Sequence, residues 1–102
     1  MNIEEFSKYV IDNMSRATLV NALNVSNKLI NGAYGVNDFI DTSLEYISIL
    51  LSYGKISSEK ASRLSVAFFN CKRDYNSDFN YSKTMILNDL IINVWEICCG
   101  VE

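Results

Sequence analysis

The chain has 102 residues, of which 49% are hydrophobic and 21% charged, and its formal net charge is −3. This is the composition of a globular protein, so we expect residues 1–102 to form a single helical domain and not a disordered segment. Histidine and proline are both absent. Without histidine the chain has no Ser–His or Cys–His nucleophile pair and no histidine metal ligand. Without proline, long uninterrupted helices are favoured.

The first two helices are predicted by capping residues and by apolar side chains at intervals of three and four. Asn2 and Glu5 have the spacing of a capping box, which predicts a helix at about 3–14. Ser15 can cap a second helix at about 16–31, which Asn31-Gly32 would end. The apolar spacing assigns these residues of the two helices to the core: Ile3, Phe6, Tyr9, Val10, Met14, Leu19, Ala22, Leu23, Ser26, Leu29 and Ile30.

Two further helices follow the turn at Gly32–Gly35. Asn37 is a suitable N-cap for a third helix at about 38–53, and a fourth helix at about 58–73 begins after Ile56-Ser57. The expected core residues of the third helix are Ile40, Leu44, Ile47 and Leu51, and those of the fourth are Ala61, Leu64, Phe68 and Cys71.

The last part of the chain combines a polar loop with the most apolar helix. Residues 74–81, DYNSDFNY, are rich in turn formers and are expected as a loop. Ser82 then caps a fifth helix at about 83–99, which Gly100 ends. Apolar residues cover about half of the circumference of this helix, so it should contact two or more neighbours at the centre of the protein. The expected fold is all-α, a compact antiparallel bundle of about five helices.

Targeting segments and disulfides are not expected. Two acids near the start argue against a signal peptide, and the longest uncharged stretch, residues 17–27, is shorter than the roughly 20 apolar residues of a membrane span. We therefore expect a cytoplasmic protein that does not contact a membrane. Its cysteines, Cys71, Cys98 and Cys99, should be reduced thiols, with Cys98 buried as a small hydrophobic residue.

The sequence contains no complete metal-binding or cofactor-binding motif. Asp74, Asn76 and Asp78 occupy the first, third and fifth positions of a calcium loop, but Phe79 replaces the required glycine and Met85 the required glutamate. No glycine-rich phosphate loop is present among the four glycines. We expect no catalytic residue, no metal and no cofactor, and therefore no enzyme.

Direct binding of nucleic acid is a weaker alternative. Residues 23–26 followed by Ile30 resemble the turn of a helix-turn-helix, but Val20 stands where that motif usually has a small residue. The recognition helix would also stop at Gly32, and the acidic chain lacks the basic face that duplex DNA requires. A continuous second helix is the favoured interpretation.

Charge is unevenly distributed along the chain. Residues 37–53 carry three acids and no base, residues 54–73 carry five bases and one acid, and residues 74–102 carry five acids and one base. This segregation indicates a basic protein partner more clearly than the net charge does.

A candidate partner surface combines acids with aromatic residues. Three acids lie within about 60° of one another on the third helix, beside tyrosines opposite its core side. Either a neighbouring helix covers these tyrosines, or they are interface anchors together with the aromatic residues of the 74–81 loop. The candidate partner-binding residues are Asp38, Asp41, Glu45, Tyr46, Tyr53, Asp74, Tyr75, Asp78, Phe79 and Tyr81.

An acidic helical chain of this size with acid–aromatic surfaces resembles the small bacterial immunity proteins of the colicin or contact-dependent growth inhibition type. The resemblance implies a basic toxin partner, often a nuclease or ribonuclease, whose active site or substrate surface the protein covers as a monomer. Two alternatives are a helix-turn-helix regulator and a helical adaptor that forms dimers through Tyr46, Ile49 and Tyr53.

Overall fold

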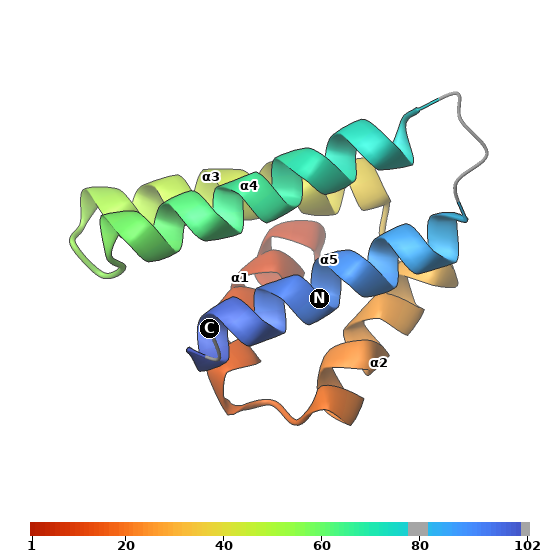
Figure 1. Cartoon of the computed structure of the whole chain (residues 1–102), viewed down its shortest axis with the longest axis horizontal. Coiled ribbons are helices and arrows are strands. Elements are labelled where there is room, and N and C mark those ends of the chain that lie inside the picture. Colours follow the sequence, from red (N-terminus) through yellow and green to blue (C-terminus); the bar gives the residue numbers. More distant parts are fainter. Residues whose placement is uncertain (78–81, 101–102) are drawn as a thin grey trace.

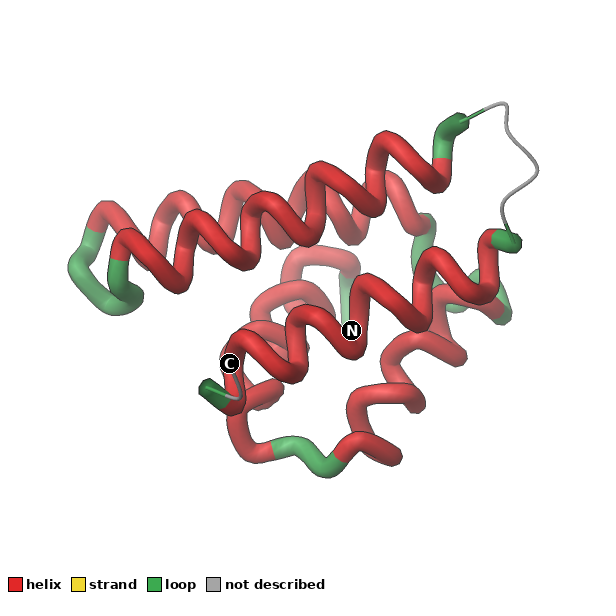
Figure 2. The backbone as a smooth tube through the Cα atoms, in the orientation of Figure 1, coloured by secondary structure: helices red, strands yellow, loops and turns green. Residues whose placement is uncertain are grey.

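The computed structural model describes residues 1–77 and 82–100. These residues form α-helices and one turn of 3-10 helix, without a strand in the described ranges (Figures 1 and 2). The elements are α1 (Ile3–Asn13), η1 (Met14–Arg16), α2 (Leu19–Ile30), α3 (Val36–Ser52), α4 (Ser58–Tyr75) and α5 (Lys83–Cys99). The all-α class and the five helices predicted from the sequence are confirmed.

The helices pack pairwise around one core. Figure 1 shows α3 and α4 as an antiparallel pair, with α5 running antiparallel to α4. Helix α1 packs on α3, and α5 contacts α4, α2 and η1. The wide apolar arc of residues 83–99 therefore does contact several neighbours, as the sequence predicts.

Several helix ends follow the local chemistry of the sequence. Asn2 and Glu5 form the expected capping box, with Glu5 N donating to Asn2 Oδ1 at 2.8 Å and Asn2 N to Glu5 Oε1 at 3.2 Å. Ser82 Oγ accepts from Met85 N at 3.3 Å at the start of α5. Gly100 ends α5 in the left-handed region, with φ of 69°, which glycine adopts without a steric penalty.

Two predicted N-caps are wrong. Ser15 falls inside η1, and Thr18 caps α2 instead by accepting from Asn21 N at 3.2 Å. Helix α3 begins after Gly35, so Asn37 lies inside its first turn. There its carboxamide exchanges two hydrogen bonds, of 3.1 and 2.8 Å, with Asn76 at the end of α4. A tertiary contact has replaced the local cap.

A row of buried phenylalanines joins three helices. The ring centroids of Phe6 on α1 and Phe39 on α3 are 5.5 Å apart, and those of Phe39 and Phe68 on α4 are 5.8 Å apart. Tyr34 stacks on Phe6 at 4.0 Å. Tilted and offset aromatic pairs at such distances stabilise a core beyond the burial of their area. The sequence did not place Phe39 in the core of the third helix.

Most of the predicted core is confirmed, but three of its residues are exposed. Leu19 is the first residue of α2 and Leu51 lies in the last turn of α3, where the neighbouring helices no longer cover them. Tyr9 is 53% exposed at the edge of a cavity between α1 and α2.

Three serines are fully buried, and two of them have hydroxyl or carboxamide partners. Ser7 Oγ and Thr42 Oγ1 are 2.5 Å apart between α1 and α3, and Ser26 Oγ donates to Asn88 Oδ1 at 2.5 Å between α2 and α5. Ser43 Oγ has no hydrogen-bond partner within the described residues. A buried polar atom without a partner loses its hydration and gains nothing in return.

Replacing Phe39 by alanine should lower the free energy of unfolding by about 3–5 kcal/mol, because a large cavity would open where Phe6 and Phe68 now meet. Urea denaturation followed by circular dichroism measures the change. The matched control is Phe69→Ala on the exposed side of α4, which should change stability by less than about 1 kcal/mol. Equal losses for both variants would contradict the central position of Phe39.

Ser43→Ala and Ser26→Ala should differ in sign. The first removes an unpartnered hydroxyl and should leave stability unchanged or raise it by up to about 1 kcal/mol. The second leaves Asn88 Oδ1 without its donor and should lower stability by about 1–3 kcal/mol. Thermal and urea unfolding of the two variants test this, and a loss of the same size in both would be inconsistent with an unpartnered Ser43.

Candidate functional site

The outer side of α3 is acidic and partly apolar. Its inner side packs between α1 and α4, so the opposite side faces solvent. We define the α3 outer face by residues Asp38, Asp41, Glu45, Ile49 and Tyr53, all exposed. Tyr53, the C-cap residue, is 76% exposed. Helical periodicity therefore placed these five residues correctly on one exposed side.

The carboxylates on this face differ in their partners. Asp41 Oδ1 lies 2.7 Å from Lys72 Nζ on α4, and this exposed ion pair contributes at most about 1 kcal/mol. Asp38 and Glu45 form no ion pair within residues 1–77 and 82–100. Two negative charges on the face are thus free to pair with a partner.

Tyr46 does not share that exposure. Its hydroxyl donates to Asp12 Oδ1 on α1 at 2.6 Å, and its ring lies 5.9 Å from Lys8 Nζ. Burial raises the pKa of the Tyr46 hydroxyl to about 12, helped by the hydrogen bond to the Asp12 carboxylate and by its charge. The tyrosine joins α3 to α1, so a neighbouring helix covers it, as one of the two sequence interpretations allows.

The predicted loop begins later than expected. Helix α4 continues through Asp74 and Tyr75, which the sequence assigned to the loop. Asp74 Oδ1 lies 3.1 Å from Arg73 Nε. Lys83 Nζ lies 4.1 Å from the Tyr75 ring centroid and donates to the Tyr75 carbonyl oxygen at 2.6 Å. Tyr75 is thus half-buried against the bundle.

The remaining three candidates, Asp78, Phe79 and Tyr81, lie outside the described residues. The antiparallel pairing does bring the end of α4, with Asp74 and Tyr75, next to the start of α3, with Asp38, since Asn76 and Asn37 are hydrogen-bonded. Tyr53 lies at the opposite end of α3.

Two neighbours of the α3 outer face were missed. Glu4 has Lys8 one turn later on α1, but no ion pair joins them. Glu4 instead lines a small cavity of about 80 Å³ together with Glu45 and Ile49. Phe69 on α4 is 58% exposed. It lies one turn before Lys72, the residue of α4 that pairs with Asp41, and so on the side of α4 that adjoins α3.

The thiols and carboxylates of the described residues are not grouped for metal binding. All three cysteines are free, as expected, and Cys98 is buried. Burial raises the pKa of Cys71 to about 12, with the charges of Asp74 and Asp89 acting in the same direction, so this thiol is not activated as a nucleophile. Among the described residues, no group of three or more Cys, Asp or Glu could hold a metal ion.

The turn required by the helix-turn-helix alternative does not form. Helix α2 runs without a break from Leu19 to Ile30, through the residues that would make the turn. This confirms the continuous second helix. No helix in the described ranges is long and apolar enough to cross a membrane.

Comparison with known proteins gave no relative. No family model, no curated protein and no solved structure matches the chain. The function must therefore be inferred from the surfaces themselves.

Replacing Tyr46 by phenylalanine should lower stability by about 1 kcal/mol at pH 7, because the hydrogen bond to Asp12 is lost. The folded pKa of this tyrosine, about 12, lies above its ordinary value of 10.0. The folded state therefore holds the proton more tightly, and this stabilisation is complete below pH 10 and is lost as the pH rises through 12. Unfolding by urea between pH 7 and 11, with absorbance titration of tyrosinate, measures both effects.

The matched control is Tyr53→Phe, which removes a hydroxyl from an exposed side chain. It should change stability by less than about 0.5 kcal/mol. If Tyr46→Phe lacks a tyrosinate transition near pH 10 that the parent protein shows, the raised pKa is contradicted.

Proposed function

We propose that this protein is an immunity protein that binds a basic toxin domain, a nuclease or ribonuclease, and neutralises it by covering its active site or substrate surface. The observation that carries the proposal is the α3 outer face, where Asp38 and Glu45 have no ion pair with a described residue and lie on the same side as exposed Ile49 and Tyr53. Free carboxylates around apolar anchors are suited to a cationic protein surface.

Electrostatics explain why the partner would be a nuclease. The substrate site of a nuclease attracts phosphate, so it presents a positive field. An anionic face of another protein can occupy the same field and exclude the nucleic acid. Charge attraction of this kind mainly raises the association rate and selects the partner.

The cavity beside Glu45 gives this contact a definite shape. Glu4 and Glu45 place two carboxylates at a cavity of about 80 Å³, and Ile49 and Tyr46 supply apolar contacts. A lysine or arginine of the toxin fits this arrangement, because its charged end can meet the carboxylates while its methylene groups lie on Ile49. Lys8 lines the same cavity, so its charge offsets one of the two carboxylates and leaves room for one further cation.

The apolar part of the contact comes from two helices. Tyr53 and Ile49 lie on α3, and Phe69 lies on the adjoining flank of α4. Aromatic residues dominate interface hot spots because they bury a large area with little loss of conformational freedom. We expect Tyr53 and Phe69 to supply most of the binding energy and the carboxylates to supply orientation.

The proposed setting is the cytoplasm, where the toxin would act and where the three thiols would stay reduced. The protein would act there as a monomer on one toxin molecule. Because the chain has no histidine, this side of the complex has no side chain whose ordinary pKa lies near neutral pH, and affinity should vary little between about pH 6 and 8.

The test uses the product of the gene adjacent to the one that encodes this chain as the candidate toxin. Its C-terminal domain should stop growth when produced alone, and the present protein should restore growth and bind it in vitro. Asp38→Lys/Glu45→Lys should weaken binding at least about thirtyfold, or about 2 kcal/mol, since the two reversed charges would repel a basic partner.

Asp89→Lys/Glu96→Lys is the matched control, with the same charge change on exposed residues of α5. It should alter affinity by less than about threefold, because those residues lie off the α3 outer face. Equal weakening by the two double variants would show that net charge alone attracts the toxin. If the parent protein fails to restore growth, the proposed function is wrong.

A further inference from the structure

A second surface of the molecule has the opposite charge. Helix α1 packs on α3 whereas α2 packs on α5, so the facing sides of α1 and α2 diverge. A cavity of about 440 Å³ opens between them and is bounded at one end by η1. None of the candidate partner-binding residues lines this cavity.

The floor of the cavity is apolar and buried. Val10, Met14 and Ala22 are buried there, and each belongs to the hydrophobic core. Val25 is half-buried, and Tyr9 stands at the rim with 53% of its surface exposed. A ligand that lies in the cavity would therefore gain apolar contact with Tyr9 and Val25 without rearranging the core.

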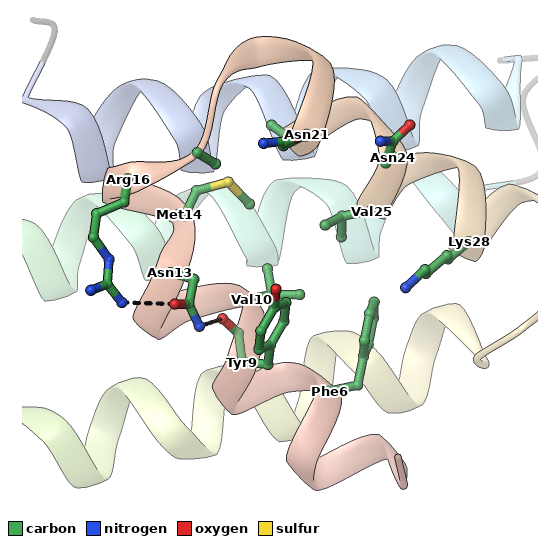
Figure 3. Close-up of a pocket in the computed structure, with 12 residues that line it drawn as sticks. Phe6, Tyr9, Val10, Asn13, Met14, Arg16, Asn21, Asn24, Val25 and Lys28 are labelled. Atoms are coloured by element: carbon green, nitrogen blue, oxygen red, sulfur yellow. Dashed lines mark hydrogen bonds between the residues drawn. The ribbon is translucent and has the colours of Figure 1, made fainter.

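The charged residues at this cavity are all cations. Figure 3 shows Arg16 at one end and Lys28 at the other, with Tyr9, Val10 and Val25 between them. No carboxylate lines the cavity, and neither cation forms an ion pair with a described residue. Lys28 Nζ lies 5.9 Å from the Phe6 ring centroid, so a ring, not a carboxylate, is its neighbour here. In a chain whose net charge is −3, two cations at one cavity without a described carboxylate partner indicate an anionic ligand.

The polar lining is made of carboxamides. Asn13 Oδ1 accepts from Arg16 Nη2 at 2.7 Å, and its Nδ2 donates to the Tyr9 carbonyl oxygen at 2.8 Å. This holds the guanidinium at the edge of the cavity. The carboxamides of Asn21 and Asn24 are exposed and have no side-chain hydrogen bond to a described residue. A carboxamide offers a donor and an acceptor together, which matches the peptide group of a bound chain.

We propose that the cavity between α1 and α2 binds an acidic segment of another polypeptide. Its carboxylates would pair with Arg16 and Lys28, its backbone would bond to Asn21 and Asn24, and an apolar side chain would lie against Tyr9 and Val25. A nucleic acid is disfavoured, because it would bring many phosphates to two cations and would leave the apolar floor unused. This site is separate from the α3 outer face and takes a ligand of the opposite charge.

The test measures fluorescence anisotropy of short labelled peptides on the full chain. The first probe alternates glutamate with leucine and valine, and two others replace every glutamate by glutamine or by lysine. The glutamate peptide should bind most tightly, and its affinity should fall as salt is added. Arg16→Gln/Lys28→Gln should weaken this binding about tenfold, as expected for the loss of two exposed charge pairs.

Lys55→Gln/Arg73→Gln removes the same charge outside this cavity and should leave affinity within about threefold. Asp38→Lys/Glu45→Lys should also still bind the acidic peptide, so the result does not depend on the proposed toxin site. In NMR spectra, the side-chain amide signals of Asn21 and Asn24 should shift on peptide addition, while that of Asn70 on α4 should not.

Three results would overturn the proposal. The glutamine peptide could bind as tightly as the glutamate peptide, the Arg16/Lys28 variant could bind like the parent protein, or a single-stranded oligonucleotide could bind more tightly than the acidic peptide and shift the same amide signals. The last result would replace the peptide by a nucleic acid as the ligand. Since the substituted side chains are exposed, unchanged thermal unfolding of each variant confirms that folding is preserved.

Discussion

The contact of Phe39 with Phe6 on one side and Phe68 on the other fixes the position of α3 between α1 and α4. Because that side of α3 is held in the core, the opposite side must face water, and its sequence is acidic with Ile49 and Tyr53. The row also reaches the other surface, since Phe6 is part of the wall of the α1–α2 cavity. The same aromatic cluster thus supports both candidate binding surfaces.

Hydrogen bonds at the helix edges also fix α3 against α1 and α4, in addition to the aromatic row. Tyr46 bonds to Asp12 between α3 and α1, and Asn37 bonds to Asn76 between α3 and α4. Such hydrogen bonds add little free energy individually, yet each has one geometry and so selects one register of neighbouring helices. The first of these bonds also withdraws Tyr46 from solvent, whereas Asp38 and Glu45 stay exposed on the α3 outer face.

Local chemistry predicted the parts of the structure that depend on neighbouring residues in the chain. The capping box at Asn2 and the limits of α5 are of this kind, as is the exposure of the acids on α3, which follows from helical periodicity. Tertiary contacts decided the rest. Asn37 was predicted to cap α3 but is hydrogen-bonded to Asn76 at the end of α4. Helix α4 was predicted to end before Asp74 but continues to Tyr75.

In the candidate site, too, some features follow from the local sequence and others only from tertiary packing. Periodicity could place Glu45 outward, but only the packing of α1 could bring Glu4 beside it or cover Tyr46. The basic cavity was invisible in the sequence because Arg16 and Lys28 come from separate elements, and no spacing rule relates the two.

The side chain of Trp95 joins the last helix to the N-terminal part of the chain. Its indole Nε1 donates to the carbonyl oxygen of Ala17 at 2.8 Å, which ties the last helix to the segment that follows the first. The packing order α1, α3, α4, α5 and η1, with η1 continuous with α1, is therefore a closed ring. A ring of helices has no outermost member that can detach while the others keep all their contacts. Helix α2 packs on α5 from outside this ring, whereas no helix of the ring can leave without breaking the circle. The single tryptophan of the chain reports on the α5 contact by its fluorescence.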